Sequence, residues 1–105
     1  MDNKNNHKSP FGNRLKEIRT IKNLSQKELG ILAGIDKFSA SPHINQYERQ
    51  KHVPDYLTAT LLANALDIPV AYLYTEDDEM AEFILAYNKA TKSTRKKVRQ
   101  ILSTE

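Results

Sequence analysis

The chain has 105 residues, the length of a single domain, so a second independent core has no room. It contains no cysteine, which excludes disulfides and thiolate zinc sites. No apolar run approaches the roughly 18 residues of a membrane span and no signal-type segment opens the chain, so we expect a cytoplasmic protein. Three glycines and four prolines favour helices over turn-rich β structure.

The net charge of +3 is unevenly distributed along the chain. Residues 1–53 carry a balance of +5, residues 54–80 carry −6, and residues 81–105 carry +4. Such blocks indicate faces with different partners. A solvated surface of uneven charge explains the pattern equally well, so charge alone assigns no function.

Residues 1–10 are expected to be a disordered polar arm, because apolar side chains are nearly absent there and little surface can be buried. From Phe11 onward, apolar residues recur at positions 11, 15, 18 and 21. This helical spacing predicts a first helix that ends near Asn23.

Ser25 and Glu28 have the spacing of a capping box, so a second helix begins at Gln26. The residues expected to face inward are Leu29, Leu32 and Ala33. Gly34 follows, where a left-handed C-terminal cap is needed. Gly30, in the middle of this helix, costs about 1 kcal/mol relative to alanine, which predicts that another helix crosses closely there.

A polar turn with Phe38 as its aromatic anchor leads into a third helix. Either Ser39 or Ser41 is its N-cap, because Pro42 is tolerated in the first turn, and the helix runs to about Arg49. The inward face consists of Ile44, Tyr47 and Glu48. The other faces carry hydrogen-bonding side chains, namely Ser41, His43, Asn45, Gln46 and Arg49.

Four further helices are predicted, opening at Pro54–Asp55, over 70–74, over 78–89, and over 94–103 with Ser93 as N-cap. The first has a broad apolar stripe fit for a core, made of Tyr56, Leu57, Leu61, Leu62, Ala65 and Leu66. The last two have the stripes Met80, Phe83, Ile84 and Tyr87, and Val98, Ile101 and Leu102. These two stripes pack against the preceding helices or against a second subunit.

Two short helices joined by a glycine turn, the second presenting polar side chains, form a helix-turn-helix whose second helix fits a major groove about 12 Å wide. The chain also contains the segments Leu15–Arg19, Leu24–Leu29, Gly34–Ile35, Ile44–Arg49, Pro54 and Leu62–Leu66 in this order. In these segments the chain resembles the phage-repressor, or Cro/CI-type (XRE), helix-turn-helix family over about residues 11–74.

The resemblance implies an all-α fold, with a five-helix phage-repressor-like DNA-binding bundle over 11–74 and two additional C-terminal helices in 75–105. It also implies that Gln26 hydrogen-bonds a DNA phosphate and that Arg19 and Glu48 form the family's internal ion pair. Lys37, Lys51 and His52 occupy turns where phosphate contacts are natural. The full set of candidate DNA-binding residues is Gln26, Lys37, Ser41, His43, Asn45, Gln46, Arg49, Lys51 and His52.

Two features depart from the family pattern. The family usually has about six positions from the glycine of the turn to the first buried aliphatic of the next helix, whereas Gly34 and Ile44 are ten positions apart. The additional residues either extend the third helix at its N-terminus or widen the loop. Gln50 stands where the family commonly has glycine, so the helix can end differently.

No phosphate loop, dinucleotide-binding glycine motif or nucleophile elbow occurs, and the three histidines lack any metal-ligand spacing, so we expect no enzyme, cofactor or metal. We expect a sequence-specific transcriptional regulator, a repressor, that binds double-stranded DNA at a palindromic operator as a homodimer. The alternative is a protein-interaction module such as the antitoxin of a toxin-antitoxin pair. The acidic segment Glu76–Glu79 and the apolar helix after it support that alternative.

Overall fold

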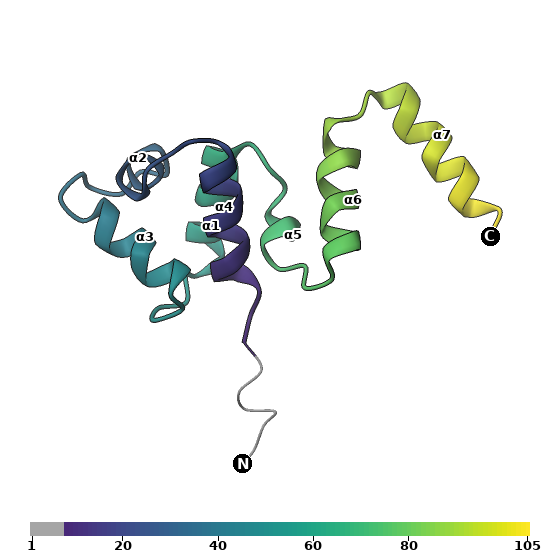
Figure 1. Ribbon diagram of the computed structural model, residues 1–105. Coiled ribbons are helices and arrows are strands. Elements are labelled where there is room, and N and C mark those ends of the chain that lie inside the picture. The colour runs from purple at the N-terminus through teal and green to yellow at the C-terminus, as the bar shows by residue number, and fades with distance from the viewer. Residues whose placement is uncertain (1–7) are drawn as a thin grey trace, which may run out of the picture.

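The structure, a computed structural model, describes residues 8–105, and every regular element within this range is a helix (Figure 1). The helices are α1 (Phe11–Ile21), α2 (Gln26–Leu32), α3 (Ala40–Glu48), α4 (Tyr56–Leu66), α5 (Val70–Leu73), α6 (Asp78–Lys89) and α7 (Lys92–Ser103). The predicted all-α class, five helices followed by two more, is confirmed. Residues 1–7 of the predicted arm lie outside the described part of the chain.

A single core joins the first five helices. Its largest fully buried side chains are Leu15, Leu29, Ile44, Leu62, Leu66 and Leu73. Each of α1 to α5 contributes at least one of them, and full burial of such a side chain stabilises the fold by roughly 1.5–3 kcal/mol. The five helices therefore depend on one another for stability.

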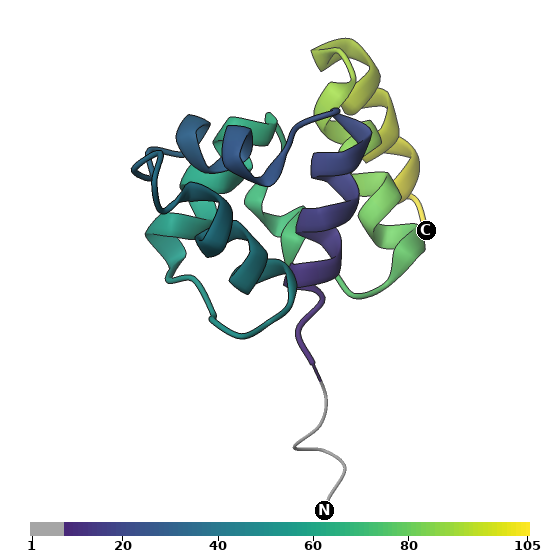
Figure 2. The ribbon, with the colours of Figure 1, turned by 60° about the vertical axis from the view of Figure 1, so that its left-hand side comes forward.

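The helix-turn-helix and the C-terminal helices lie at opposite ends of the molecule. In two views that differ by 60°, α2 and α3 lie on one side of α1 while α6 and α7 lie on the other (Figures 1 and 2). The C-terminal helices therefore leave α3 uncovered.

Arg14 of α1 fastens the start of α6 to the bundle. Its Nε donates to the carbonyl of Thr75 at 2.9 Å, and its Nη2 donates to Asp78 Oδ1 at 3.0 Å. The guanidinium also lies 5.6 Å from the ring centroid of Tyr72, and Ala81 of α6 is buried. The junction between the bundle and α6 is thus held by several polar contacts and by packing.

No residue of α7 is buried. Its first turns are attached to the end of α6, where Arg95 Nε donates to the carbonyl of Tyr87 at 2.8 Å and Arg99 Nη1 donates to the Tyr87 hydroxyl at 2.6 Å. Farther along α7, Ile101 and Leu102 are exposed. The helix is therefore amphipathic, with an apolar face that nothing covers among residues 8–105.

The predicted apolar stripes were too broad. Residues that the sequence pattern assigned inward but that the structure exposes are Leu32, Tyr56, Leu57 and Leu61. In α4 the buried set is Ala59, Leu62, Ala63 and Leu66, which follows the i, i+3, i+4, i+7 pattern of one helical face. The bundle covers this single face, so the apolar residues on its flanks remain in contact with solvent.

Several predicted helix ends were also displaced. α1 ends at Ile21 instead of Asn23, because Asn23 has a left-handed backbone (φ +59°) and its N–H bonds back to the Thr20 carbonyl. α5 ends at Leu73, one residue early. α7 begins at Lys92 with Thr91 as its cap, so the assignment of Ser93 was wrong.

None of the helices among residues 8–105 combines the length and the apolar character that crossing a bilayer requires.

Candidate nucleic-acid interface

Local hydrogen bonds set the limits of α2 where the sequence predicted them. Ser25 Oγ accepts a hydrogen bond from the Glu28 N–H at 2.9 Å, and the Ser25 N–H donates to Glu28 Oε1 at 2.7 Å. These bonds from the backbone and hydroxyl of Ser25 lower the pKa of the Glu28 carboxyl. At the other end Gly34 has φ +92°, and the Ile35 N–H bonds back to the Gly30 carbonyl at 2.9 Å. The predicted capping box and glycine cap are confirmed.

Gly30 lets α2 and α3 touch. A Cβ atom built at Gly30 would lie 2.5 Å from the Ala40 Cβ and 2.9 Å from the Ala40 Cα. Real Cβ atoms do not approach so closely, so α3 is the crossing helix that the mid-helix glycine predicted. This contact sets the position of α3 relative to α2.

The additional residues between Gly34 and Ile44 are shared between a turn and a helical extension. The turn ends at Ser39, which is the N-cap, and α3 begins at Ala40, one helical turn before Ile44. The Ser39 side chain makes no capping hydrogen bond. Both alternatives drawn from the sequence are thus present, and α3 starts two residues earlier than Pro42.

Gln50 ends α3 in the conformation that glycine favours. Its φ is +60°, its N–H bonds to the Tyr47 carbonyl at 3.2 Å, and the Lys51 N–H bonds to the Gln46 carbonyl at 2.8 Å. These two bonds are those of a Schellman cap. The substitution at this position therefore leaves the helix ending unchanged, although a side chain in the left-handed region costs about 1–2 kcal/mol.

The predicted ion pair between Arg19 and Glu48 is present. Arg19 Nε lies 2.6 Å from Glu48 Oε2 and Arg19 Nη2 lies 3.1 Å from Oε1, a bidentate arrangement. The Glu48 side chain is only 3% exposed. A third Arg19 nitrogen, Nη1, donates to the Leu24 carbonyl at 2.8 Å. The pair ties α1 to the inner face of α3.

The Gln26 amide is engaged within the protein. Its Nε2 donates to Glu48 Oε1 at 3.1 Å and lies 3.4 Å from Asn45 Oδ1, while its Oε1 accepts from the Ser41 hydroxyl at 3.5 Å. Sequence reasoning missed these contacts, because it placed Gln26 on a phosphate. They join the start of α2 to two polar residues of α3 and to the buried ion pair.

The polar side chains of α3 are not sealed in the bundle. Ser41, Asn45 and Gln46 are half-buried, whereas His43 and Arg49 are exposed. The Nδ1 atom of His43 lies 2.8 Å from the carbonyl of Ser39, which orients its ring. The remaining candidates Lys37, Lys51 and His52 are exposed in the turns before and after α3.

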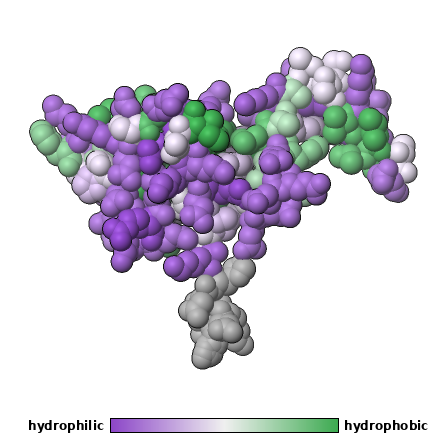
Figure 3. Space-filling view, in the orientation of Figure 1, coloured by the Kyte–Doolittle hydropathy of each residue, from purple (hydrophilic) through white to green (hydrophobic). Residues whose placement is uncertain are grey.

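The surface around α3 and the surface over α7 differ in hydropathy. Hydrophilic residues dominate the end of the molecule that carries α3, while a hydrophobic area lies over α7 at the opposite end (Figure 3). Within α3, burial raises the pKa of the Tyr47 phenol, and the negative charge of Asp55 raises it further. In the range 8–105, His, Asp and Glu side chains nowhere gather in groups of three that could hold a metal ion.

Phe38 is not the anchor that the sequence predicted. Its side chain is 82% exposed in the turn before α3, and the Lys37 ammonium lies 5.2 Å from its ring centroid. The core next to this turn is filled by Ala40 and Ile44, which are fully buried. The available signal was the run of polar residues around Phe38, which supplies no apolar partner for its ring.

A family model described as "Helix-turn-helix" matches residues 15–73. Among solved structures, the chain is similar to the transcriptional regulator BswR, with 43% identity over 90% of this chain and 94% of that one and a TM-score of 0.86. It is also similar to the restriction-modification controller protein C.AhdI from Aeromonas hydrophila, with 36% identity over 63% of this chain and 94% of that one and a TM-score of 0.56. No curated protein matches the chain.

Proposed function

Because the chain belongs to the XRE (Cro/CI-type) helix-turn-helix family of DNA-binding transcriptional regulators, we propose that it is a repressor that binds a palindromic operator as a homodimer. The family is not enzymatic. The observation that carries the proposal is the uncovered polar face of α3, which nothing among residues 8–105 shields from a DNA major groove.

Gln46 is the proposed base-reading residue. Its amide makes no hydrogen bond to any other residue in the described range, so both its donor and its acceptor can meet an adenine edge. Asn45 retains its NH₂ donors because its oxygen accepts from Gln26. Ser41 and His43 complete the groove-facing set. The proposed phosphate contacts are Lys37, Arg49, Lys51 and His52. Gln26 joins them by exchanging its long hydrogen bond to Asn45 for one to a phosphate oxygen.

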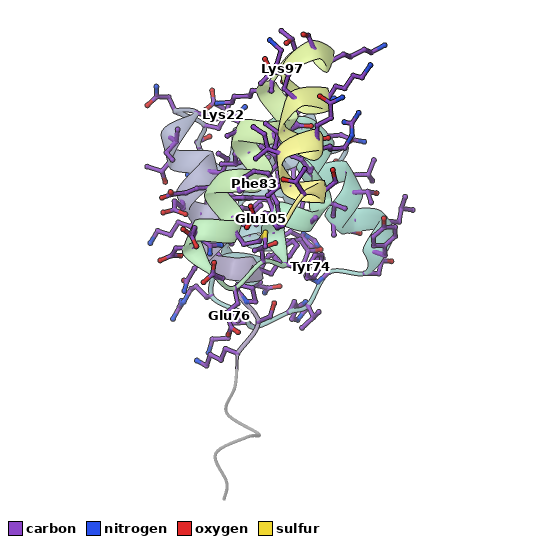
Figure 4. The ribbon with its side chains drawn as sticks, turned by 90° about the vertical axis from the view of Figure 1, so that its right-hand side faces the viewer. Lys22, Tyr74, Glu76, Phe83, Lys97 and Glu105 are labelled. Carbon is purple, nitrogen blue, oxygen red and sulfur yellow. The ribbon has the colours of Figure 1, made fainter. Side chains whose placement is uncertain are left out.

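The open face of α6 and α7 is the proposed dimer interface. A cavity of about 330 Å³ lies between these helices and is lined by Asp77, Glu79, Met80, Phe83 and Leu102. Figure 4 looks onto this face, with Phe83 near its middle. A second copy supplies an identical apolar face across a two-fold axis, and a stable dimer buries roughly 800 Å² on each partner. Residues 11–74 would then be the DNA-binding domain and 75–105 the dimerisation segment.

Gel-shift titration against the region upstream of the protein's own gene tests the DNA-binding function. We expect one saturable site whose affinity falls steeply as salt rises, because phosphate contacts release counterions. Gln46→Ala should relax preference at one or two operator positions with the melting temperature unchanged. Asn64→Ala removes an exposed amide on α4 and is the matched control. Absence of binding at about 50 mM salt would contradict the proposal.

Sedimentation equilibrium tests the homodimer. Phe83 is 43% exposed and Leu102 is 55% exposed, so Phe83→Glu and Leu102→Glu place charges on the open face with little effect on the core. Both variants should be monomeric, melt near the wild-type temperature and bind the operator more weakly. A wild-type protein that stays monomeric at tens of micromolar contradicts the dimer and leaves the DNA-binding test unaffected.

A second candidate function is supported by the same face. The acids Asp77 and Glu79 line its cavity beside Met80 and Phe83, which suits a small basic protein with an apolar patch, as in an antitoxin holding a toxin. Stoichiometric co-purification of such a protein would favour this function. A monodisperse homodimer that has lost no partner would disfavour it.

A further inference from the structure

The turn between α2 and α3 presents one aromatic side chain to solvent. Phe38 is 82% exposed, although phenylalanine is among the side chains that folding most often buries. The Lys37 ammonium lies 5.2 Å from its ring centroid. An exposed aromatic in a folded turn thus contributes little to the stability of the monomer.

The backbone that carries Phe38 is pinned on both sides. The Phe38 N–H donates to Asp36 Oδ2 at 3.0 Å, and the Ser39 N–H donates to the Asp36 carbonyl at 2.9 Å. The turn enters from the glycine cap of α2 and leaves into α3, where Ala40 is locked against Gly30. The backbone of Phe38 is therefore held in one position, and its ring extends from it into solvent.

The place of Phe38 in the fold indicates what it meets. It stands directly before Ser39, the N-cap of α3, and the N-terminal end of a recognition helix is the end that contacts base edges. The Lys37 cation beside the ring favours an approach to the DNA backbone, and the Asp36 carboxylate is held to the Phe38 N–H.

We propose that Phe38 contacts the 5-methyl group of a thymine in the operator and so determines specificity at that position. Thymine alone among the four bases presents a methyl group in the major groove, and an apolar side chain is the natural partner for it. This inference rests on the proposed DNA-binding function. It assigns to the turn before α3 a reading role additional to that of the polar residues on the helix.

Replacement of operator thymines by deoxyuridine, one at a time, tests the contact without changing base pairing. Wild-type affinity should fall about fourfold at one position in each half-site, the factor that corresponds to about 0.8 kcal/mol for one buried carbon. Phe38→Ala should bind the unmodified operator at least about fourfold more weakly and should not respond to deoxyuridine at that position. Ile21→Ala, which shortens an exposed apolar residue of α1, is the matched control and should bind as wild type does.

The melting temperature of Phe38→Ala should equal that of the wild type, because the ring is exposed. An unchanged melting temperature shows that a loss of affinity does not come from unfolding. Specific wild-type binding with no thymine sensitive to its methyl group overturns the inference while the proposed function stands. An affinity loss in Phe38→Ala that is equal on operator and non-operator DNA overturns it too, because the ring then makes a contact without sequence preference. Failure of the wild type to bind any operator overturns both.

Discussion

The ion pair between Arg19 and Glu48 makes a sharp prediction about stability, because its two partners differ in burial. The Glu48 side chain is 3% exposed and the Arg19 side chain is 13% exposed. Arg19→Met leaves the buried carboxylate with the Gln26 amide as its remaining donor. Glu48→Met leaves a guanidinium that still donates to the Leu24 carbonyl and has a long stem to reach solvent.

Removal of the partner of a buried charge costs about 3–5 kcal/mol, so we expect a loss of this size in Arg19→Met. A loss of about 1 kcal/mol lowers the melting temperature of a domain of this size by about 4 °C or more, so the melting temperature of Arg19→Met should fall by about 12 °C or more. The loss is a large part of the free energy of unfolding, which is typically about 5–15 kcal/mol because folded domains are marginally stable. Glu48→Met should lose less, about 1–3 kcal/mol, because the remaining guanidinium stays hydrogen-bonded. The order of the two variants follows from burial alone.

The double variant Arg19→Met/Glu48→Met isolates the interaction. It contains no unpaired charge, so it should be more stable than Arg19→Met, with a coupling free energy of about 1–3 kcal/mol. Urea denaturation followed by circular dichroism and tyrosine fluorescence gives all the values required. Lys16→Met, on the exposed face of α1, is the control and should change stability by less than about 0.5 kcal/mol. Strictly additive losses would refute the reasoning.

Three further predictions concern the local structure. Gly34→Ala should lower the free energy of unfolding by about 1–2 kcal/mol through its left-handed backbone alone, since a Cβ there meets no atom. Gly30→Ala places a Cβ against Ala40, so it should displace α3 and weaken operator binding in a gel shift. Arg14→Met should increase amide hydrogen exchange at the start of α6 while exchange in α3 stays unchanged. Hydrogen bonds lower the pKa of Glu28 and of Asp55 in the folded state. Their contribution to the free energy of unfolding is therefore complete above about pH 4.3, the ordinary range of these carboxyls, and is lost as pH falls through the lowered pKa values. Urea midpoints between pH 7 and pH 2 should show this decline, and a midpoint that rises on acidification would contradict it.

Features that depend on a few neighbouring residues could be predicted from the sequence. The capping box at Ser25, the glycine cap at Gly34 and the close contact at Gly30 follow from backbone hydrogen bonding and from the space that a Cβ needs. The pair Arg19 and Glu48 followed from the family resemblance, and the physical need of a buried carboxylate for a cation agrees with it. The all-α class and the order of the helices followed from the same local signals.

Features that depend on what a helix packs against could not be predicted. The apolar stripe of α4 is wider than the surface the bundle covers, so Tyr56 and Leu57 are exposed. Thr91 and Ser93 are both good caps, and the choice between them accompanies a tertiary contact, the bond from Arg95 to the Tyr87 carbonyl. Likewise the hydrogen bond from Gln26 to Glu48 requires α2 and α3 to be placed before it can be seen.

The additional residues before Ile44 are divided between the turn and the first turn of α3, and the contacts of α3 with the bundle form around them. Ala40 lies four positions before Ile44, and because an α-helix has 3.6 residues per turn, both residues lie on the same buried face. Its small side chain fits against Gly30, where a larger residue at either position would force α2 and α3 apart. The face of Ile44 and Glu48 therefore stays in place, and the ion pair with Arg19 forms as it would in a shorter helix. The added length lies at the end of α3 where the proposed DNA contacts of Ser41 and His43 are, so a deletion within residues 36–39 should weaken operator binding in a gel shift.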